Sequence, residues 1–396
     1  MARRNDDANG TVRRRTTENS KIDERIPEEQ PKASFYDIVS SSLPEWINLI
    51  TIGSLIFGGC CANVFALEAI ITEAPGSGTL ITCTQFCVTA LLSLWSQVDR
   101  SRGIRHFYFK PRAIPLKKWV IYTAMFLTIN VLNNMAFDYK ISVPLHIILR
   151  SAGPVTTMAV GHLAGKRYTR VQVLAVTLLF LGVIQAAIAD AISKGRQINL
   201  LKDSSTSHSD LIIGFGLLFL ALLLSAIMGV YTDRIYTTHG RNHWGENLFY
   251  SHTIALPFFM LYWSDLKDQA QAVLASPNAN MVFVIPPASS EPFFVLRFVG
   301  ENVSIQAALL AINAFTQYLC IRGVNKLSAQ SSSLTVTIVL NIRKLVSLLL
   351  SIWLFGNRLA PGVVVGALLV FLGGGLYALP DKKPTPSRKK ASRKTQ

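Results

Sequence analysis

Two positively charged residues, Arg343 and Lys344, stand side by side within the long apolar segment 328–355. As a helix the segment could cross a bilayer, which takes about 20 residues. A cation at that depth costs at least about 2.5 kcal/mol and needs a partner or a water-filled cavity. The segment contains no acidic residue. We therefore predict that its partner is a phosphate group that binds and leaves, held bidentately by arginine and as a point charge by lysine.

Helical spacing gathers the polar residues of this segment. At about 100° per residue, Ser333, Thr337, Asn341 and Lys344 share one face, and Arg343 lies on the adjacent face. The pattern predicts a polar groove with positive charge along an otherwise apolar helix.

Other apolar segments also carry isolated polar residues. If these segments face one cavity, their polar side chains can contact the rest of an anionic ligand. The predicted substrate-binding residues are Asn133, Asn134, Arg150, Tyr250, His252, Asn313, Gln317, Thr337, Asn341, Arg343 and Lys344. Two structural alternatives stay open. Each asparagine could instead bond a neighbouring membrane helix, and His252 could be a core histidine.

The sequence contains none of the patterns typical of an enzyme's reactive centre. H-E-x-x-H, the P-loop and G-x-S-x-G are all missing from it. A membrane-embedded transferase would need an acid or base near the cations, and His252 is the one deep candidate. We therefore expect no catalytic residues, no metal and no cofactor.

Composition indicates a membrane protein. Of 396 residues 50% are hydrophobic, and the mean hydropathy is +0.34. The net charge of +16 lies mostly in tails and short loops, which is typical of membrane orientation, and no nucleic-acid partner is expected. The five cysteines lie in apolar segments, so we expect packing roles and no disulfide.

The hydropathy pattern predicts an all-α fold of ten transmembrane helices. The expected spans are 46–71, 79–96, 118–139, 142–164, 169–190, 211–232, 247–264, 303–324, 328–354 and 359–379. Residues 281–298 are apolar but broken by prolines, and we predict a lumenal loop there. An even number of spans puts both tails on the same side of the membrane. The segments on that side contain 28 Lys and Arg residues, and the loops on the other side contain 7. The positive-inside rule then places both termini in the cytosol.

A weak internal repeat divides the chain in two. Residues 180–182 match residues 371–373 at an offset of 191. Five helices per half make the second half enter from the opposite side, as in inverted repeats whose substrate site lies at the midplane. The predicted parts are a disordered cytosolic tail 1–45, a first repeat 46–190, a lumenal linker 191–210, a second repeat 211–379 and a basic cytosolic tail 380–396.

Several motifs resemble the nucleotide-sugar transporters of the drug/metabolite transporter superfamily, in the UDP-N-acetylglucosamine/UDP-xylose branch. The motifs are FGGCCANVFALE (57–68), PGSGTLITCTQF (75–86), VLNNMAFDYKISVPLHIILRS (131–151), ENLFYSH (246–252), TQYLCIRGV (316–324) and SLTVTIVLNIRKLVSLLLSI (333–352). The resemblance implies a five-plus-five inverted repeat that exchanges cytosolic nucleotide sugar for lumenal nucleoside monophosphate.

The resemblance also implies roles for two short motifs. FYSH stands where relatives carry a Phe-Tyr-Asn-Asn base-recognition motif, which adds Phe249 to the site; Ser251 and His252 depart from that pattern. NIRK keeps the Asn and Lys of a phosphate and sugar motif as Asn341 and Lys344.

The expected function is therefore import of UDP-N-acetylglucosamine into the endoplasmic reticulum or Golgi lumen in exchange for UMP. UDP-xylose stays open as a substrate. The alternative is an exporter of a non-nucleotide small molecule. The expected partners are the UDP-sugar, UMP and membrane lipids. A homodimer stays open, although Gly362 and Gly366 favour packing inside the bundle over a dimer face.

Overall fold

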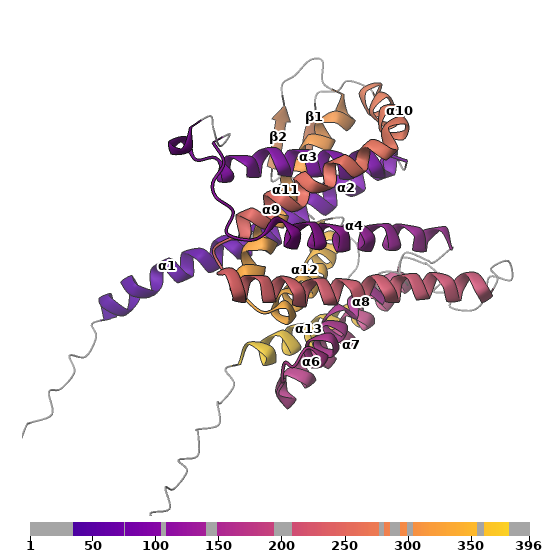
Figure 1. Ribbon diagram of the computed structural model, residues 1–396. Helices are drawn as coiled ribbons and strands as arrows, with labels where there is room; N and C mark the ends of the chain where they lie inside the picture. Colours follow the sequence, from indigo (N-terminus) through magenta and orange to yellow (C-terminus); the bar gives the residue numbers. More distant parts are fainter. Residues whose placement is uncertain are drawn as a thin grey trace, which may run out of the picture. The chain divides into compact units, whose positions relative to one another are not determined.

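The structure is a computed structural model (Figure 1). It describes residues 35–74, 76–103, 108–139, 149–193, 208–276, 281–285, 294–298, 304–354 and 360–379. The chain divides into two units, residues 1–47 and 48–396. Both the predicted basic tail 380–396 and most of the predicted linker lie outside the described residues.

Nearly all of the described chain is helical. The helices are α1 Phe35–Gly53, the π-helix η1 Ser54–Gly59, α2 Cys60–Glu73, α3 Gly78–Gln97, η2 Arg100–Arg102, α4 Leu116–Asp138, α6 Gly153–Leu163, α7 Arg170–Ser193, α8 His208–His239, α9 Trp244–Phe259, η4 Met260–Tyr262, α10 Trp263–Leu274, α11 Ile305–Gln330, α12 Ser333–Leu354 and α13 Pro361–Ala378.

Seven helical stretches in the described part are long and apolar enough to cross a membrane. They are Leu43–Ile71, Gly78–Gln97, Arg170–Asp190, Ile212–His239, Ile305–Gln330, Ser333–Leu350 and Pro361–Ala378. Each overlaps a predicted span. The predicted spans 118–139, 142–164 and 247–264 correspond to α4, α6 and α9, which do not meet the same criteria. The chain is thus a helical membrane protein.

Two expectations about element boundaries need correction. Helix α1 begins at Phe35, so the disorder predicted for residues 35–45 is wrong there. The charge-rich composition that suggested disorder ends before this point. The predicted span 247–264 overruns α9 and η4 into the amphipathic helix α10, Trp263–Leu274, whose Leu266 and Val273 are buried; residues 265–274 had no predicted structure.

The predicted lumenal loop 281–298 contains two short strands, β1 Met281–Ile285 and β2 Phe294–Phe298. They pair antiparallel with Met281 opposite Phe298 (Figure 1). Five residues are too few for a membrane-spanning strand, which needs about 9–11. Neither of the two described strands is therefore long enough to span a membrane.

Glycines allow α7 and α13 to pack closely. A Cβ on Gly366 would lie 2.6 Å from the backbone nitrogen of Ala186, and one on Gly182 would lie 2.7 Å from the carbonyl oxygen of Gly366. A Cβ on Gly373 would lie 2.7 Å from the carbonyl oxygen of Ala175. Small residues permit this approach in membrane helices. The glycine motif of α13 thus packs inside the bundle.

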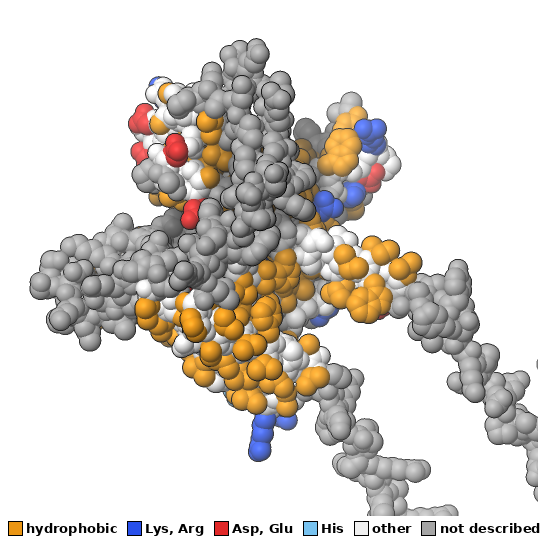
Figure 2. All heavy atoms as spheres, turned by 180° about the vertical axis from the view of Figure 1, so that it is seen from behind, with side chains coloured by type: hydrophobic (Ala, Val, Ile, Leu, Met, Phe, Trp, Pro, Cys, Tyr) orange, Lys and Arg blue, Asp and Glu red, His pale blue; other side chains and the backbone are white. Residues whose placement is uncertain are grey.

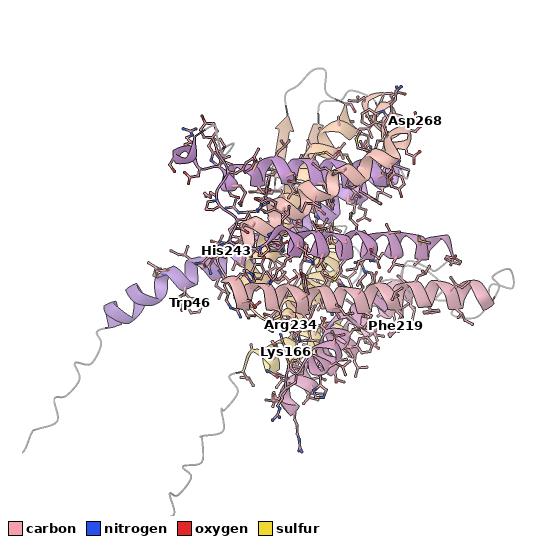
Figure 3. All side chains as sticks on the ribbon, in the orientation of Figure 1. Trp46, Lys166, Phe219, Arg234, His243 and Asp268 are labelled. Carbon is pink, nitrogen blue, oxygen red and sulfur yellow. A yellow bond between two sulfur atoms is a disulfide. The ribbon has the colours of Figure 1, made fainter. Side chains whose placement is uncertain are left out.

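The outer faces of these helices are apolar. Figure 2 shows hydrophobic side chains gathered in the lower part of the view, where α7 and α13 lie. Among the exposed hydrophobic residues of α7 and α13 are Leu174, Leu181, Leu368 and Leu372, all more than half exposed. Farther along the bundle Phe219 on α8 is 66% exposed (Figure 3). Such surfaces are typical of lipid contact.

A disulfide joins α2 to α11 between Cys60 and Cys320. The expectation that no cysteine forms a disulfide is therefore wrong. The two residues are 260 positions apart in sequence, so spacing alone could not pair them. Gly59 brings the helices together, because a Cβ there would lie 2.9 Å from the backbone nitrogen of Cys320. Cys61, Cys83 and Cys87 are free.

Candidate functional site

Helix α12 presents its polar face to the interior, as its spacing predicts. Leu334, Ile338 and Leu345 anchor the helix in an apolar cluster with α7 and α13. This packing directs Thr337, Asn341 and Lys344 to the wall of a cavity, together with Arg343. The cavity has a volume of about 240 Å³.

Four helical segments form this cavity. They are α4, the first turns of α6 with the residues just before it, the middle of α8, and α12. The lining residues are Ile129, Asn133, Arg150, Gly153, Pro154, Thr157, Ala221, Leu222, Ser225, Ala226, Thr337, Leu340, Asn341, Arg343 and Lys344.

The cavity is strongly electropositive. Arg150, Arg343 and Lys344 are its three charged lining residues, and no acidic residue is among them. The Nε atom of Arg343 is buried and has no hydrogen-bond partner within the described part of the chain. Charges of one sign in a low-dielectric site repel one another unless an anion neutralises them. The arrangement therefore suits a phosphate ligand.

The fourth predicted span is interrupted beside this cavity. Residues 149–151 are helical, Ala152 is a turn, and α6 starts again at Gly153 with Pro154 in its first turn. Proline has no N–H and cannot bond the carbonyl four residues earlier. Helix α6 thus begins at the cavity wall, where its N-terminal end adds partial positive charge.

Side chains of α12 bond the carbonyl groups at this interruption. Asn341 Nδ2 donates to the Ser151 carbonyl oxygen at 2.9 Å. Lys344 Nζ donates to the Arg150 carbonyl oxygen at 3.4 Å. The cations and the interrupted helix are therefore directly connected.

The structure brings six of the twelve predicted residues into the cavity. These are Asn133, Arg150, Thr337, Asn341, Arg343 and Lys344. Asn133 Nδ2 bonds the Ile129 carbonyl in its own helix at 2.8 Å, which leaves its Oδ1 as an acceptor. The side chain of Asn134 lies outside the described residues.

The FYSH motif lies on α9, and none of its residues is in the cavity lining. Phe249, Ser251 and His252 are buried, and Tyr250 is half-buried. Phe249 packs on Phe109, with ring centroids 6.0 Å apart, and on Tyr250 at 5.1 Å. His252 Nδ1 lies 2.8 Å from the Leu248 carbonyl oxygen, and the His252 ring is 4.7 Å from that of Phe86.

Asn313 and Gln317 on α11 are also absent from the cavity lining. Asn313 is fully buried, and its Nδ2 donates to the Asn63 carbonyl while Asn63 Nδ2 donates back to the Asn313 carbonyl. Gln85 Nε2 donates to Asn313 Oδ1 at 2.7 Å. These bonds are those of a helix-packing residue, the alternative that the sequence left open. Gln317 is half-buried.

Two polar lining residues escaped the sequence prediction, Thr157 on α6 and Ser225 on α8. Ser225 stands alone among apolar residues in the run 217–230. An isolated hydroxyl in so apolar a run is a signal that could have marked it.

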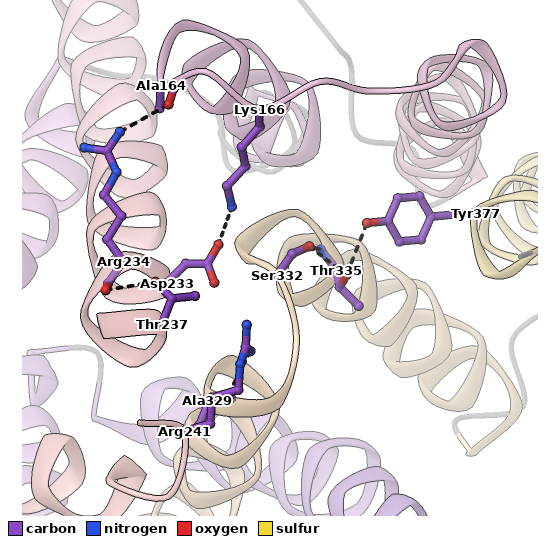
Figure 4. A network of polar contacts seen from close by, with 10 residues as sticks. All are labelled: Ala164, Lys166, Asp233, Arg234, Thr237, Arg241, Ala329, Ser332, Thr335 and Tyr377. Carbon is purple, nitrogen blue, oxygen red and sulfur yellow. Dashed lines mark hydrogen bonds and ion pairs between the residues drawn. The ribbon is translucent and has the colours of Figure 1, made fainter. Parts of the chain in front are cut away.

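Polar contacts tie the helices together at the end of α8 that is remote from Phe219 (Figures 3 and 4). Lys166, in the turn between α6 and α7, forms an ion pair with Asp233 of α8. Arg234 Nη2 donates to the Ala164 carbonyl at 3.2 Å, and Arg241 Nη1 donates to the Ala329 carbonyl at 3.0 Å. Partial burial raises the pKa of the neighbouring Tyr168 hydroxyl. These contacts join α8 and the residues after it to the α6–α7 turn and to α11.

Known proteins resemble this chain over most of its length. The UDP-N-acetylglucosamine transporter yea4 of Schizosaccharomyces pombe is 40% identical over 333 residues, covering 84% of this chain and 95% of the relative. YEA4 of Saccharomyces cerevisiae, also named a UDP-N-acetylglucosamine transporter, is 34% identical, covering 87% and 98%. The human nucleotide sugar transporter SLC35B4 is 34% identical, covering 82% and 91%.

A solved structure described as "Crystal structure of protein" matches with a TM-score of 0.53 at 8% identity, covering 82% of this chain and 97% of that chain. This similarity concerns the fold alone. The UAA transporter family matches residues 48–381. The chain belongs to the UAA transporter family, whose members are transporters and not enzymes.

Proposed function

We propose that this protein exchanges cytosolic UDP-N-acetylglucosamine for lumenal UMP across the membrane of the endoplasmic reticulum or Golgi. The observation that carries the proposal is the cavity where Arg150, Arg343 and Lys344 converge with no acidic lining residue. Nucleotide sugars and nucleoside monophosphates share a phosphate next to the nucleoside. Arginine binds such a group bidentately and lysine adds a point charge.

Neutral polar groups in the cavity would contact the remainder of the ligand. Asn133 offers an acceptor oxygen, and the hydroxyls of Thr157 and Ser225 can donate or accept. The relatives named above support a UDP-sugar substrate. One relative, from Danio rerio, is named a UDP-xylose and UDP-N-acetylglucosamine transporter, and UDP-xylose is therefore the second substrate to test.

The cavity would have to widen to admit a whole nucleotide sugar, because pockets for ligands of that size usually exceed about 300 Å³. Its volume of about 240 Å³ suits the phosphate region alone. Substrate entry would thus require a movement of the surrounding helices, as alternating access does.

Helix packing supports a five-plus-five inverted repeat. Helix α4 packs on α8, and their counterparts in the other repeat, α11 and α2, also pack on each other. At the offset of 191, the close approach of Gly182 to Gly366 corresponds to that of Gly373 to Ala175. Such reciprocal contacts between α7 and α13 are expected of helices related by a two-fold axis.

The distribution of charge supports cytosolic termini. The predicted tail side carries most of the Lys and Arg outside the spans, including Lys166, Arg234 and Arg241. The polar network of Figure 4 would then lie at the cytosolic end of the transport path. Residence in the endoplasmic reticulum or Golgi is part of the same proposal, because the proposed exchange joins a cytosolic nucleotide sugar to a lumenal nucleotide.

The same charges would couple the two directions of transport. A closed carrier without phosphate would hold uncompensated cations in a low-dielectric cavity, so it should change sides slowly. In a carrier that has bound either nucleotide, the phosphate neutralises these cations, so the change of sides is faster. Obligatory exchange follows, with no ion gradient required.

The test is uptake of labelled UDP-N-acetylglucosamine by vesicles reconstituted with the purified protein. We expect uptake to depend on trapped UMP and to be competed by UDP-xylose. An exporter of a non-nucleotide small molecule, the alternative, would ignore both nucleotides. Uptake that is identical with and without trapped UMP would contradict the antiport.

A further inference from the structure

The interruption ahead of α6 exposes a carbonyl group in the cavity wall. In a continuous helix the N–H of residue 154 would bond the carbonyl of Arg150, but Pro154 has none. A carbonyl left without a donor in a membrane is costly. Lys344 Nζ supplies the donor from α12, at 3.4 Å.

The same ammonium group is a phosphate ligand under the proposed function. Lys344 lines the cavity with Arg150 and Arg343. The long contact to the carbonyl is weaker than an ordinary hydrogen bond of about 2.9 Å. A phosphate oxygen, which bears charge, is the stronger acceptor.

We propose that Pro154 is a positioning residue that makes the Arg150 carbonyl compete with the substrate phosphate for Lys344. The Arg150 carbonyl accepts a hydrogen bond from the Lys344 ammonium at the cavity wall, and the bound phosphate replaces this carbonyl as the acceptor. Binding therefore breaks a bond between α12 and the interrupted helix, which belong to different proposed repeats. This inference rests on the proposed function.

A distinctive consequence concerns affinity. Restoring an N–H at residue 154 would give the carbonyl its own donor and free Lys344. Phosphate binding would then not break a bond between Lys344 and the Arg150 carbonyl, so the affinity of the protein for nucleotide should rise. Loss of a purely structural proline would instead weaken binding or leave it unchanged.

The experiment measures UMP affinity by calorimetry on the full-length protein in lipid nanodiscs. We expect P154A and P154S, which both restore the N–H, to lower the Kd for UMP by about three- to tenfold. Two variants are used because either one could disturb folding. The control is P361A, at the first position of α13 and absent from the cavity lining, which should leave the Kd unchanged.

The double variants P154A/K344M and P154S/K344M test the route through Lys344. With the ammonium removed, restoring the N–H should no longer change the Kd relative to K344M alone. Two results would overturn the inference: a Kd for UMP in the folded single variants that equals or exceeds that of wild type, or the same fall in Kd in the double variants relative to K344M. The proposed function would still hold in either case if the wild type exchanges UDP-N-acetylglucosamine for UMP. If the wild type neither binds UMP nor exchanges UDP-N-acetylglucosamine, both fail.

Discussion

Replacing Asn313 by alanine should destabilise the protein without weakening nucleotide binding. The change removes the bond from Asn313 Nδ2 to the Asn63 carbonyl at 3.1 Å and the bond from Gln85 Nε2 to Asn313 Oδ1 at 2.7 Å. Interhelical bonds in membranes contribute about 0.6–1.7 kcal/mol each, and a buried partner left unpaired costs about 1–3 kcal/mol. We therefore expect a loss of about 2–4 kcal/mol in the free energy of unfolding.

Two measurements separate this outcome from a role in the site. Thermal unfolding in detergent should show a clear decrease in Tm for N313A, and calorimetry should give a Kd for UMP within about twofold of wild type. The matched control is N133A, at a cavity-lining asparagine, for which we expect weaker UMP binding. An N313A protein of unchanged Tm with tenfold weaker UMP binding would refute the packing role.

Two further predictions concern helix packing. The first concerns the disulfide between Cys60 and Cys320: maleimide should label three thiols in the denatured, unreduced protein and five after reduction. Labelling of five thiols without reduction would exclude the disulfide. For the α7–α13 contact, G366A should cost about 1–3 kcal/mol in unfolding free energy because its Cβ would meet backbone atoms. The matched change G375A, with no atom within 4 Å of its Cβ, should be neutral or slightly stabilising; equal effects of the two changes would contradict the packing.

The helices that carry strong hydropathy were predictable from the sequence. Segments such as 169–190 and 359–379 are apolar enough to be recognised singly, and α7 and α13 follow them closely. The polar face of α12 was predictable for a similar reason, since helical periodicity alone sorts Thr337, Asn341 and Lys344 onto one side.

Long-range pairing was not predictable. Nothing local distinguishes Asn313, which bonds another helix, from Asn133, which lines the cavity. The disulfide likewise joins residues of distant helices. The consequence of Pro154 also required the structure, because only the approach of α12 shows which side chain takes the Arg150 carbonyl.

The most direct test of the central claim is nucleotide exchange by the double variant R343M/K344M. The two methionines keep apolar bulk but remove two of the three cavity charges. Bonds to charged groups contribute about 1.5–3 kcal/mol each, so binding should weaken by about 10²-fold or more. The control K326M removes a cation that lies 5.9 Å from the Trp244 ring and is absent from the cavity lining. We predict that reconstituted R343M/K344M loses exchange of UDP-N-acetylglucosamine for UMP while K326M retains it; a folded double variant that exchanges at the wild-type rate would contradict the account.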